Sequence, residues 1–250
     1  MDVFGEYRSL LGRAPSSDVF AALIELYRQH GRLEDYIWRY VQDHLSRWPA
    51  RIERRLSFEH VEKLRSRLRR MTARELSLYN GVFFDEDYQD LGDIIAVIKR
   101  MPHLTYLRAP YLSLKGEAEE PLRDFWRRCA ALAQLRVLDM RYAGLDDDML
   151  RLLETGSWPS LESLYLQHNP FGAEGLGYLI QSGVLRTLKV LDLRHVPIRL
   201  EGAQLLANQP DLAAVEALYL YREDVTVSGL NALENSKYLS PQLAAIFGAR

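Results

Sequence analysis

Apolar residues recur along most of this chain in a fixed order, at positions 1, 4, 6, 9 and 11 of a repeating unit. The segment 161–171 fits the unit well, with Leu161, Leu164, Leu166 and Phe171 at apolar positions and Asn169 at position 9. Six copies begin at residues 73, 104, 135, 161, 188 and 215, the first two being looser. Their starts lie 31, 31, 26, 27 and 27 residues apart, which predicts a repeat architecture.

Each unit predicts one strand followed by a turn and a helix. The apolar alternation at its start is typical of a short strand, and the stretches between have helical spacing, as at Leu176, Leu179 and Ile180. Such a unit cannot bury its apolar face alone, so neighbouring units must stack and complete one another's core. We therefore expect an α/β fold: a curved solenoid with parallel strands on its concave face and helices on its convex face.

The chain resembles the leucine-rich repeats, and in particular the long ribonuclease-inhibitor-like subtype. The resemblance rests on Leu-x-x-Leu-x-Leu-x-x-Asn-x-Phe over 161–171, followed by Gly172-Ala-Glu-Gly175 at the expected helix entry, and it covers about residues 73–240. It implies the fold but hardly any chemistry, because this scaffold hosts many functions. Only Asn169 is Asn at position 9, so the other turns must satisfy their backbone groups differently.

Residues 1–72 contain no copy of the unit and have long helical periodicity with few glycines, which predicts an α-helical N-terminal cap domain. The leucine-rich-repeat domain is expected to occupy 73–250, with a C-terminal cap at 238–250 that closes the open end of the solenoid. Its residues Leu243, Ile246 and Phe247 are expected to face the last repeat.

Within the N-terminal region, the segment from Phe20 to Trp48 resembles one tetratricopeptide-like helical hairpin. There is only one copy, so peptide binding of the tetratricopeptide kind is not implied. In combining leucine-rich repeats with a short helical companion domain, the chain resembles bacterial proteins whose role is unassigned. The excess of 27 Arg over 5 Lys agrees with a bacterial origin from a GC-rich genome.

Composition and charge exclude several classes. The 250 residues are 48% hydrophobic and 26% charged, enough for a sizeable core, and the net charge of −2 argues against a wholly basic nucleic-acid protein. The single cysteine, Cys129, excludes an internal disulfide framework and is expected to be a buried or half-buried thiol. There is no signal-like apolar start and no apolar run long enough to span a membrane, so a cytoplasmic location is expected.

The outward-facing strand positions, 2, 3, 5, 7 and 8, are rich in Tyr, Arg and His, residue types that carry much of the energy of protein interfaces. They form the candidate partner-binding face. An alternative stays open, because exposed strands favour Tyr in any case and Asp139 with Arg141, or Asp192 with Arg194, could be self-satisfying charge pairs. The candidate residues are Arg108, Asp139, Arg141, Tyr142, Tyr165, His168, Asp192, Arg194, His195, Tyr219, Tyr221 and Arg222.

His168 and His195 occupy position 8 of adjacent units and should lie close together. We expect no metal there, because no carboxylate or thiol falls at a neighbouring position 8 and Arg222 would repel a cation. A pH-sensitive interface contact is the favoured role.

The segment 47–70 has the sharpest charge asymmetry, with nine basic and three acidic residues. Read as basic helices, it predicts a second possible function, the binding of nucleic acid or an anionic surface. A solvated helix face beside the more acidic repeats is the plainer alternative. The residues that would carry such binding are Arg47, Arg51, Arg54, Arg55, Arg65 and Arg69.

The enzyme signatures sought are absent from the sequence: there is no nucleotide-binding glycine loop, no Gly-x-Ser-x-Gly and no His-Glu-x-x-His. We therefore predict no catalytic residue, no cofactor and no small-molecule substrate. The favoured hypothesis is a non-catalytic scaffold or regulator that binds a protein partner on its concave face, with nucleic-acid or anionic-surface binding as the alternative.

Overall fold

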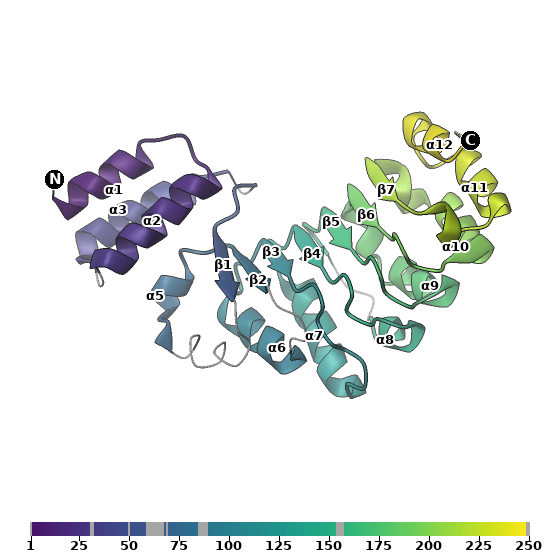
Figure 1. Cartoon of the computed structure of the whole chain (residues 1–250), viewed down its shortest axis with the longest axis horizontal. Helices are drawn as coiled ribbons and strands as arrows, with labels where there is room; N and C mark the ends of the chain where they lie inside the picture. Colours follow the sequence, from purple (N-terminus) through teal and green to yellow (C-terminus); the bar gives the residue numbers. More distant parts are fainter. Residues whose placement is uncertain are drawn as a thin grey trace.

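A computed structural model of the chain describes residues 2–30, 33–49, 51–58, 68, 70–84, 90–153 and 158–248. Within this part, the strands form one parallel sheet in chain order, and the helices of the repeats line its outer side (Figure 1). The predicted α/β solenoid, with parallel strands on one face and helices on the other, is confirmed. The strands are β1 (Arg55–Phe58), β2 (Gly81–Phe84), β3 (Tyr106–Arg108), β4 (Val137–Asp139), β5 (Ser163–Tyr165), β6 (Val190–Asp192) and β7 (Ala217–Tyr219).

The helical elements of the repeats lie between successive strands, on the convex side, and α11 follows the last strand, β7. The α-helices are α5 (Ala73–Leu76), α6 (Leu91–Arg100), α7 (Glu119–Ala131), α8 (Asp147–Arg151), α9 (Ala173–Gln181), α10 (Arg199–Ala207) and α11 (Val227–Glu234). The described residues also form three 3-10 helices, η1 (Val184–Thr187), η2 (Pro210–Ala214) and η3 (Arg222–Asp224).

Five of the six predicted units are in the predicted register. Position 4 of each is the central residue of its strand, so Leu138 pairs with Leu164 and Leu164 with Leu191. These leucines are at most 2% exposed, because alternate strand residues turn toward the helices and stack into one column. The column is the reason that a leucine at position 4 recurs so regularly.

The unit predicted to begin at residue 73 is wrong. Thr72 and Glu75 form a capping box that starts the short helix α5 at Ala73, where the prediction required a strand. The strand comes later, and Val82 of β2 pairs with Leu107, so this repeat begins at residue 79.

The expectation of helices throughout 47–70 is also wrong, because β1 lies inside that segment. Leu56 is 1% exposed and pairs with Val82, which places it at position 4 of a further repeat unit. Position 1 of that unit is Glu53, a polar residue, so the apolar template does not detect it.

The N-terminal helices are α1 (Val3–Leu11), α2 (Ser17–His30) and α3 (Asp35–Ser46). The helices α2 and α3 lie against one another through Tyr27 and Trp38, whose ring centroids are 6.1 Å apart. The N-terminal helices contact the first repeats: the rings of Phe20 and Tyr79 meet edge to face at 5.6 Å, and Gln42 donates to the Ser77 hydroxyl.

The helix α12 (Pro241–Gly248) follows the last repeat. Leu243 and Phe247 are buried as predicted, but Ile246 is 62% exposed. The buried face of α12 includes Ala244 instead, and in a helix Ile246 lies about 100° from the centre of the arc formed by the three buried residues.

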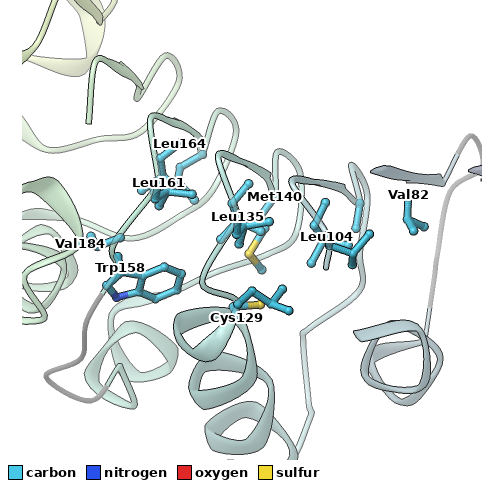
Figure 2. Close-up of a cluster of buried hydrophobic side chains, with 14 of the residues drawn as sticks. Val82, Leu104, Cys129, Leu135, Met140, Trp158, Leu161, Leu164 and Val184 are labelled. Carbon is cyan, nitrogen blue, oxygen red and sulfur yellow. The ribbon is translucent and has the colours of Figure 1, made fainter. Parts of the chain in front are cut away.

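One hydrophobic core runs through the repeats (Figure 2). Leu104, Leu135 and Leu161, each at position 1 of its unit, are at most 2% exposed, and Met140 lies among them. Cys129 reaches this core from α7 and is fully buried, as predicted. Burial raises the pKa of its thiol, because the charged thiolate would lose its hydration.

Candidate partner-binding face

Five aromatic rings lie in a row at the carboxyl ends of β3 to β7, the first four stacked and the fifth tilted by 60°, and we call this row the ring ladder. Its members are Tyr111, Tyr142, His168, His195 and Tyr221, and successive ring centroids lie 4.7, 4.1, 3.9 and 4.5 Å apart. The first four occupy position 8 of consecutive units. The predicted proximity of the two histidines is therefore confirmed, and they form the centre of a longer stack.

The backbone of the ladder is left-handed at its first four residues, with φ between 58° and 66°. This conformation lets the Tyr142 N–H donate to the Gln167 carbonyl of the next unit at 2.9 Å, and His168 N–H donates to Arg194 in the same way. The next unit differs at this place, because Tyr221 caps the 3-10 helix η3, and the His195 N–H donates to the Asp224 carboxylate at 2.7 Å. A left-handed non-glycine residue costs on the order of 1 kcal/mol.

Two Asp–Arg pairs lie beside the ladder and resemble one another closely. Arg141 donates from Nε and Nη2 to Asp139, with Nη2 to Oδ2 at 2.5 Å, and Arg194 makes the same contacts to Asp192 at 2.6 Å. Both carboxylates are 1% exposed, whereas the arginine side chains are 41% and 39% exposed. The hydrogen bonds to Asp139 and Asp192 raise the pKa of each arginine. The self-satisfying pairs left open as an alternative do form.

Gln167 lies between the two pairs, on the intervening repeat. Its Nε2 donates to Asp192 at 2.6 Å, which ties the second pair to the middle of the face. Its Oε1 is buried and has no hydrogen-bond partner in the part of the chain described. Neither Gln167 nor Tyr111 is among the predicted binding residues. Tyr111 could have been identified from the sequence, because it occupies position 8 of its unit.

The two candidate tyrosines at position 5 have different surroundings. Tyr219 is 46% exposed, and the Arg194 guanidinium lies 5.3 Å from the centre of its ring. Tyr165 is half-buried and packs against a concave-side cluster that includes Tyr106 and Val137. Sequence reasoning did not identify this cluster.

The N-terminal half of the concave face is closed by its own side chains. The Phe83 ring is 7% exposed, with the guanidiniums of Arg55 and Arg108 at 4.3 and 4.8 Å from its centre. Arg108, predicted as a binding residue, also donates to Glu53 at 2.7 Å. Burial raises the pKa of Glu53 even though both arginines act in the opposite direction.

The environment of His168 disfavours its protonation. Burial and the neighbouring His195 lower the pKa of His168, and Arg194 adds to this effect, while Asp224 and Asp192 oppose it. Within the described ranges, no group of three His, Cys, Asp or Glu side chains is arranged to hold a metal ion.

The basic residues proposed for the alternative function do not share one helix. Arg47 pairs with Asp43 at 2.7 Å, Arg51 is exposed, and Arg55 stacks on Phe83. Arg54 is half-buried, and burial lowers its pKa. The remaining two, Arg65 and Arg69, lie outside the described residues.

A sequence model described as Leucine Rich repeat matches residues 159–179 and 184–207, the units that contain β5 and β6. No curated protein matches the chain. In the described part, no helix has the length and apolar character needed to cross a membrane.

Three solved structures are similar to the chain at low sequence identity. The chain is similar to a tropomodulin C-terminal domain of Caenorhabditis elegans (12% identity, TM-score 0.44, 63% of this chain and 95% of that one). It is also similar to actin-binding site 2 of leiomodin-1 (15%, 0.43, 62% and 88%). A third is TLR13 in complex with ssRNA13 (14%, 0.41, 71% of this chain), of which the match covers only 26%. Scores this low carry no information about function.

Proposed function

We propose that this leucine-rich-repeat protein is a non-catalytic interaction module, a scaffold or a regulator, which binds a partner protein with the C-terminal half of its concave face. The observation that carries the proposal is the exposed row of tyrosines along that half. Tyr111, Tyr142, Tyr219 and Tyr221 are each 39–46% exposed, although their rings offer large apolar areas.

Tyrosine and arginine suit this role for physical reasons. A tyrosine ring adds contact area and a hydroxyl while losing few rotamers on binding, and these two residue types dominate interface hot spots. Stacking already restrains the ladder rings, and Asp139 and Asp192 hold Arg141 and Arg194, so little side-chain entropy remains to be lost. The ladder crosses five strands, a width of about 19 Å, which fits one peptide segment or one helix.

The proposal places the partner on the ring ladder and the C-terminal strands, because the strand faces of β2 to β4 offer no comparable surface. Phe83, Tyr106 and Val137 are each less than 9% exposed. Their apolar area is covered within the chain, so it is not available to a partner.

The test is a pull-down from lysate of the source organism with the wild-type chain and the double variant Tyr142→Asn/Tyr219→Ser. Asparagine is chosen because it tolerates the left-handed backbone at position 142. The control is Tyr36→Ser, which removes an equally exposed tyrosine, 55% exposed, from α3.

The proposal expects partners that the wild type and Tyr36→Ser retain and the double variant loses, with the three chains equally folded by circular dichroism. It is wrong if every captured partner survives the double substitution. If partners still bind the double variant but added salt releases them, and nucleic acid is released with them, the function belongs to the basic segment 47–70.

A further inference from the structure

We infer that the partner segment bound by this face is acidic and proline-rich, with carboxylates at every third residue in a polyproline II conformation. The inference rests on the proposed function and deepens it. It comes from the distribution of charge across the face and from the spacing of its two exposed arginines.

Charge on the face is arranged in two layers. At positions 5, 7 and 8, toward the carboxyl ends of β4 to β7, the charges that reach solvent are all cationic (Arg141, Arg194 and Arg222), whereas Glu162 and Glu216 occupy position 2, at the opposite ends of the strands. The carboxylates at these positions, Asp139 and Asp192, are 1% exposed and lie beneath their arginines. A docked anion would therefore meet guanidinium groups first and the carboxylates only at a greater distance, so the net interaction is attractive.

The two central arginines are prepared to bind a carboxylate. Arg141 and Arg194 each use Nε and Nη2 for their own aspartate, and Nη1 takes no part in those contacts. A guanidinium carries five N–H donors, so each arginine keeps donors for a ligand while its position is held by the pair. Charge-assisted hydrogen bonds to a carboxylate are the stronger class of hydrogen bond.

The spacing of these arginines selects a backbone conformation. They follow β4 and β6, two strands apart, which is about 9.6 Å. In a polyproline II segment, residues i and i+3 point to the same side and lie about 9.3 Å apart. In an extended β-segment, same-side residues lie about 6.8 or 13.6 Å apart, which does not match.

The tyrosines agree with the same occupant. Aromatic-lined grooves bind proline-rich polyproline II segments, because the preformed helix loses little entropy and prolines pack on aromatic side chains. Tyr219 and Tyr221 lie beside Arg194, and Tyr142 follows Arg141 directly, so aromatic and cationic contacts alternate along the face.

The experiment measures binding of fluorescein-labelled peptides to the full chain by fluorescence anisotropy. The first peptide contains four Glu-Pro-Pro triplets, and the second replaces every Glu with Gln. The third has the same composition as the first, arranged as two copies of Glu-Glu-Pro-Pro-Pro-Pro, and contains no pair of glutamates three residues apart.

The variants neutralise one pair at a time, so that no buried carboxylate loses its partner. They are Asp139→Asn/Arg141→Gln and Asp192→Asn/Arg194→Gln. The control is Asp124→Asn/Arg128→Gln, which removes an Asp–Arg pair, with Nε to Oδ2 at 2.8 Å, from the convex helix α7, where Arg127 also donates to Asp124.

We expect the triplet peptide to bind at least about tenfold more tightly than the other two, the effect of one charge-assisted hydrogen bond. Each concave-face variant should lose about tenfold, and the α7 variant should bind like the wild type. The inference is overturned if the glutamine or rearranged peptide binds equally well, or if a folded concave-face variant keeps full affinity.

Two outcomes separate this inference from the proposed function. If no peptide binds while Tyr142→Asn/Tyr219→Ser still loses its protein partner, the acidic proline-rich segment is wrong and the interaction function stands. If a single-stranded oligothymidine binds more tightly than the triplet peptide and the same variants abolish its binding, the ligand is a nucleic acid and the inference fails.

Discussion

Asn169 provides the sharpest test of how these repeats are held together. It is 1% exposed and accepts a hydrogen bond from the Leu145 N–H at 3.0 Å, while its Nδ2 donates to the carbonyls of Met140 and Leu166 at 3.0 and 2.8 Å. Asn169→Ala removes three hydrogen bonds and leaves these three buried backbone groups without a partner. An unpaired buried group costs about 1–3 kcal/mol, and near the lower end of that range three such groups give a total loss of about 3–5 kcal/mol.

The assay is urea denaturation followed by circular dichroism and by tryptophan fluorescence, with the free energy of unfolding compared where the two transitions coincide. Asn208→Ala is the matched control, because the Asn208 amide also donates to a carbonyl, that of Gln204 at 2.9 Å, but at an exposed site where water replaces it. This control should stay within about 0.5 kcal/mol of the wild type. A loss below about 1 kcal/mol for Asn169→Ala, or equal losses for both variants, would refute the reasoning.

Three further predictions concern other sites. In α9, a Cβ at position 175 would lie 2.6 Å from the Asp147 carboxylate, whereas a Cβ at position 177 would meet nothing within 4 Å. Gly175→Ala should therefore destabilise the chain by about 1–3 kcal/mol, and Gly177→Ala should stabilise it by about 0.5–1 kcal/mol. Equal melting-point shifts for the two variants would contradict this prediction. The pKa of His168 in the folded chain lies below its ordinary value of 6.5, so the unfolded chain binds a proton at His168 more tightly. The free energy of unfolding should therefore fall as the pH drops from 6.5 through the folded-state pKa. Chemical denaturation should show that this pH dependence is weaker in His168→Gln. The buried Cys129 thiol should react with Ellman's reagent only at the rate of unfolding, and fast labelling of the native chain would show that it is accessible.

The periodic leucines made most of the fold predictable, and the failures have a physical cause. From β3 onward, position 4 is buried in the column and the template finds each strand in register. In β2 every residue is buried, because Arg55 and Arg108 cover Phe83 on the concave side, so the strand has no polar alternation to detect. A continuous apolar run is a weak strand signal by itself.

The repeat unit predicts which positions lie on the candidate face, but it does not predict the arrangement of their side chains. Position in the unit places Asp139 and Arg141 on the concave side, yet it does not show that the carboxylate is covered and the guanidinium exposed. It also predicts that His168 and His195 are neighbours. The parallel stacking of their rings follows from a left-handed backbone at position 8, which tyrosine and histidine do not indicate by sequence alone.

In the turn after β5, two adjacent residues have different roles: one stabilises the fold and the other contributes to the surface. Asn169 is buried and bonds three backbone groups, whereas His168 beside it has a left-handed backbone, and its ring is part of an outward-facing stack. Glycine or asparagine would adopt that backbone at lower cost, and the same holds for Tyr111, Tyr142 and His195. The large rings at position 8 of four consecutive units therefore lower backbone stability, and together they form a continuous aromatic surface. This is the relation expected of a contact face, and it is the reason that Tyr142→Asn should weaken partner binding without lowering the stability of the fold.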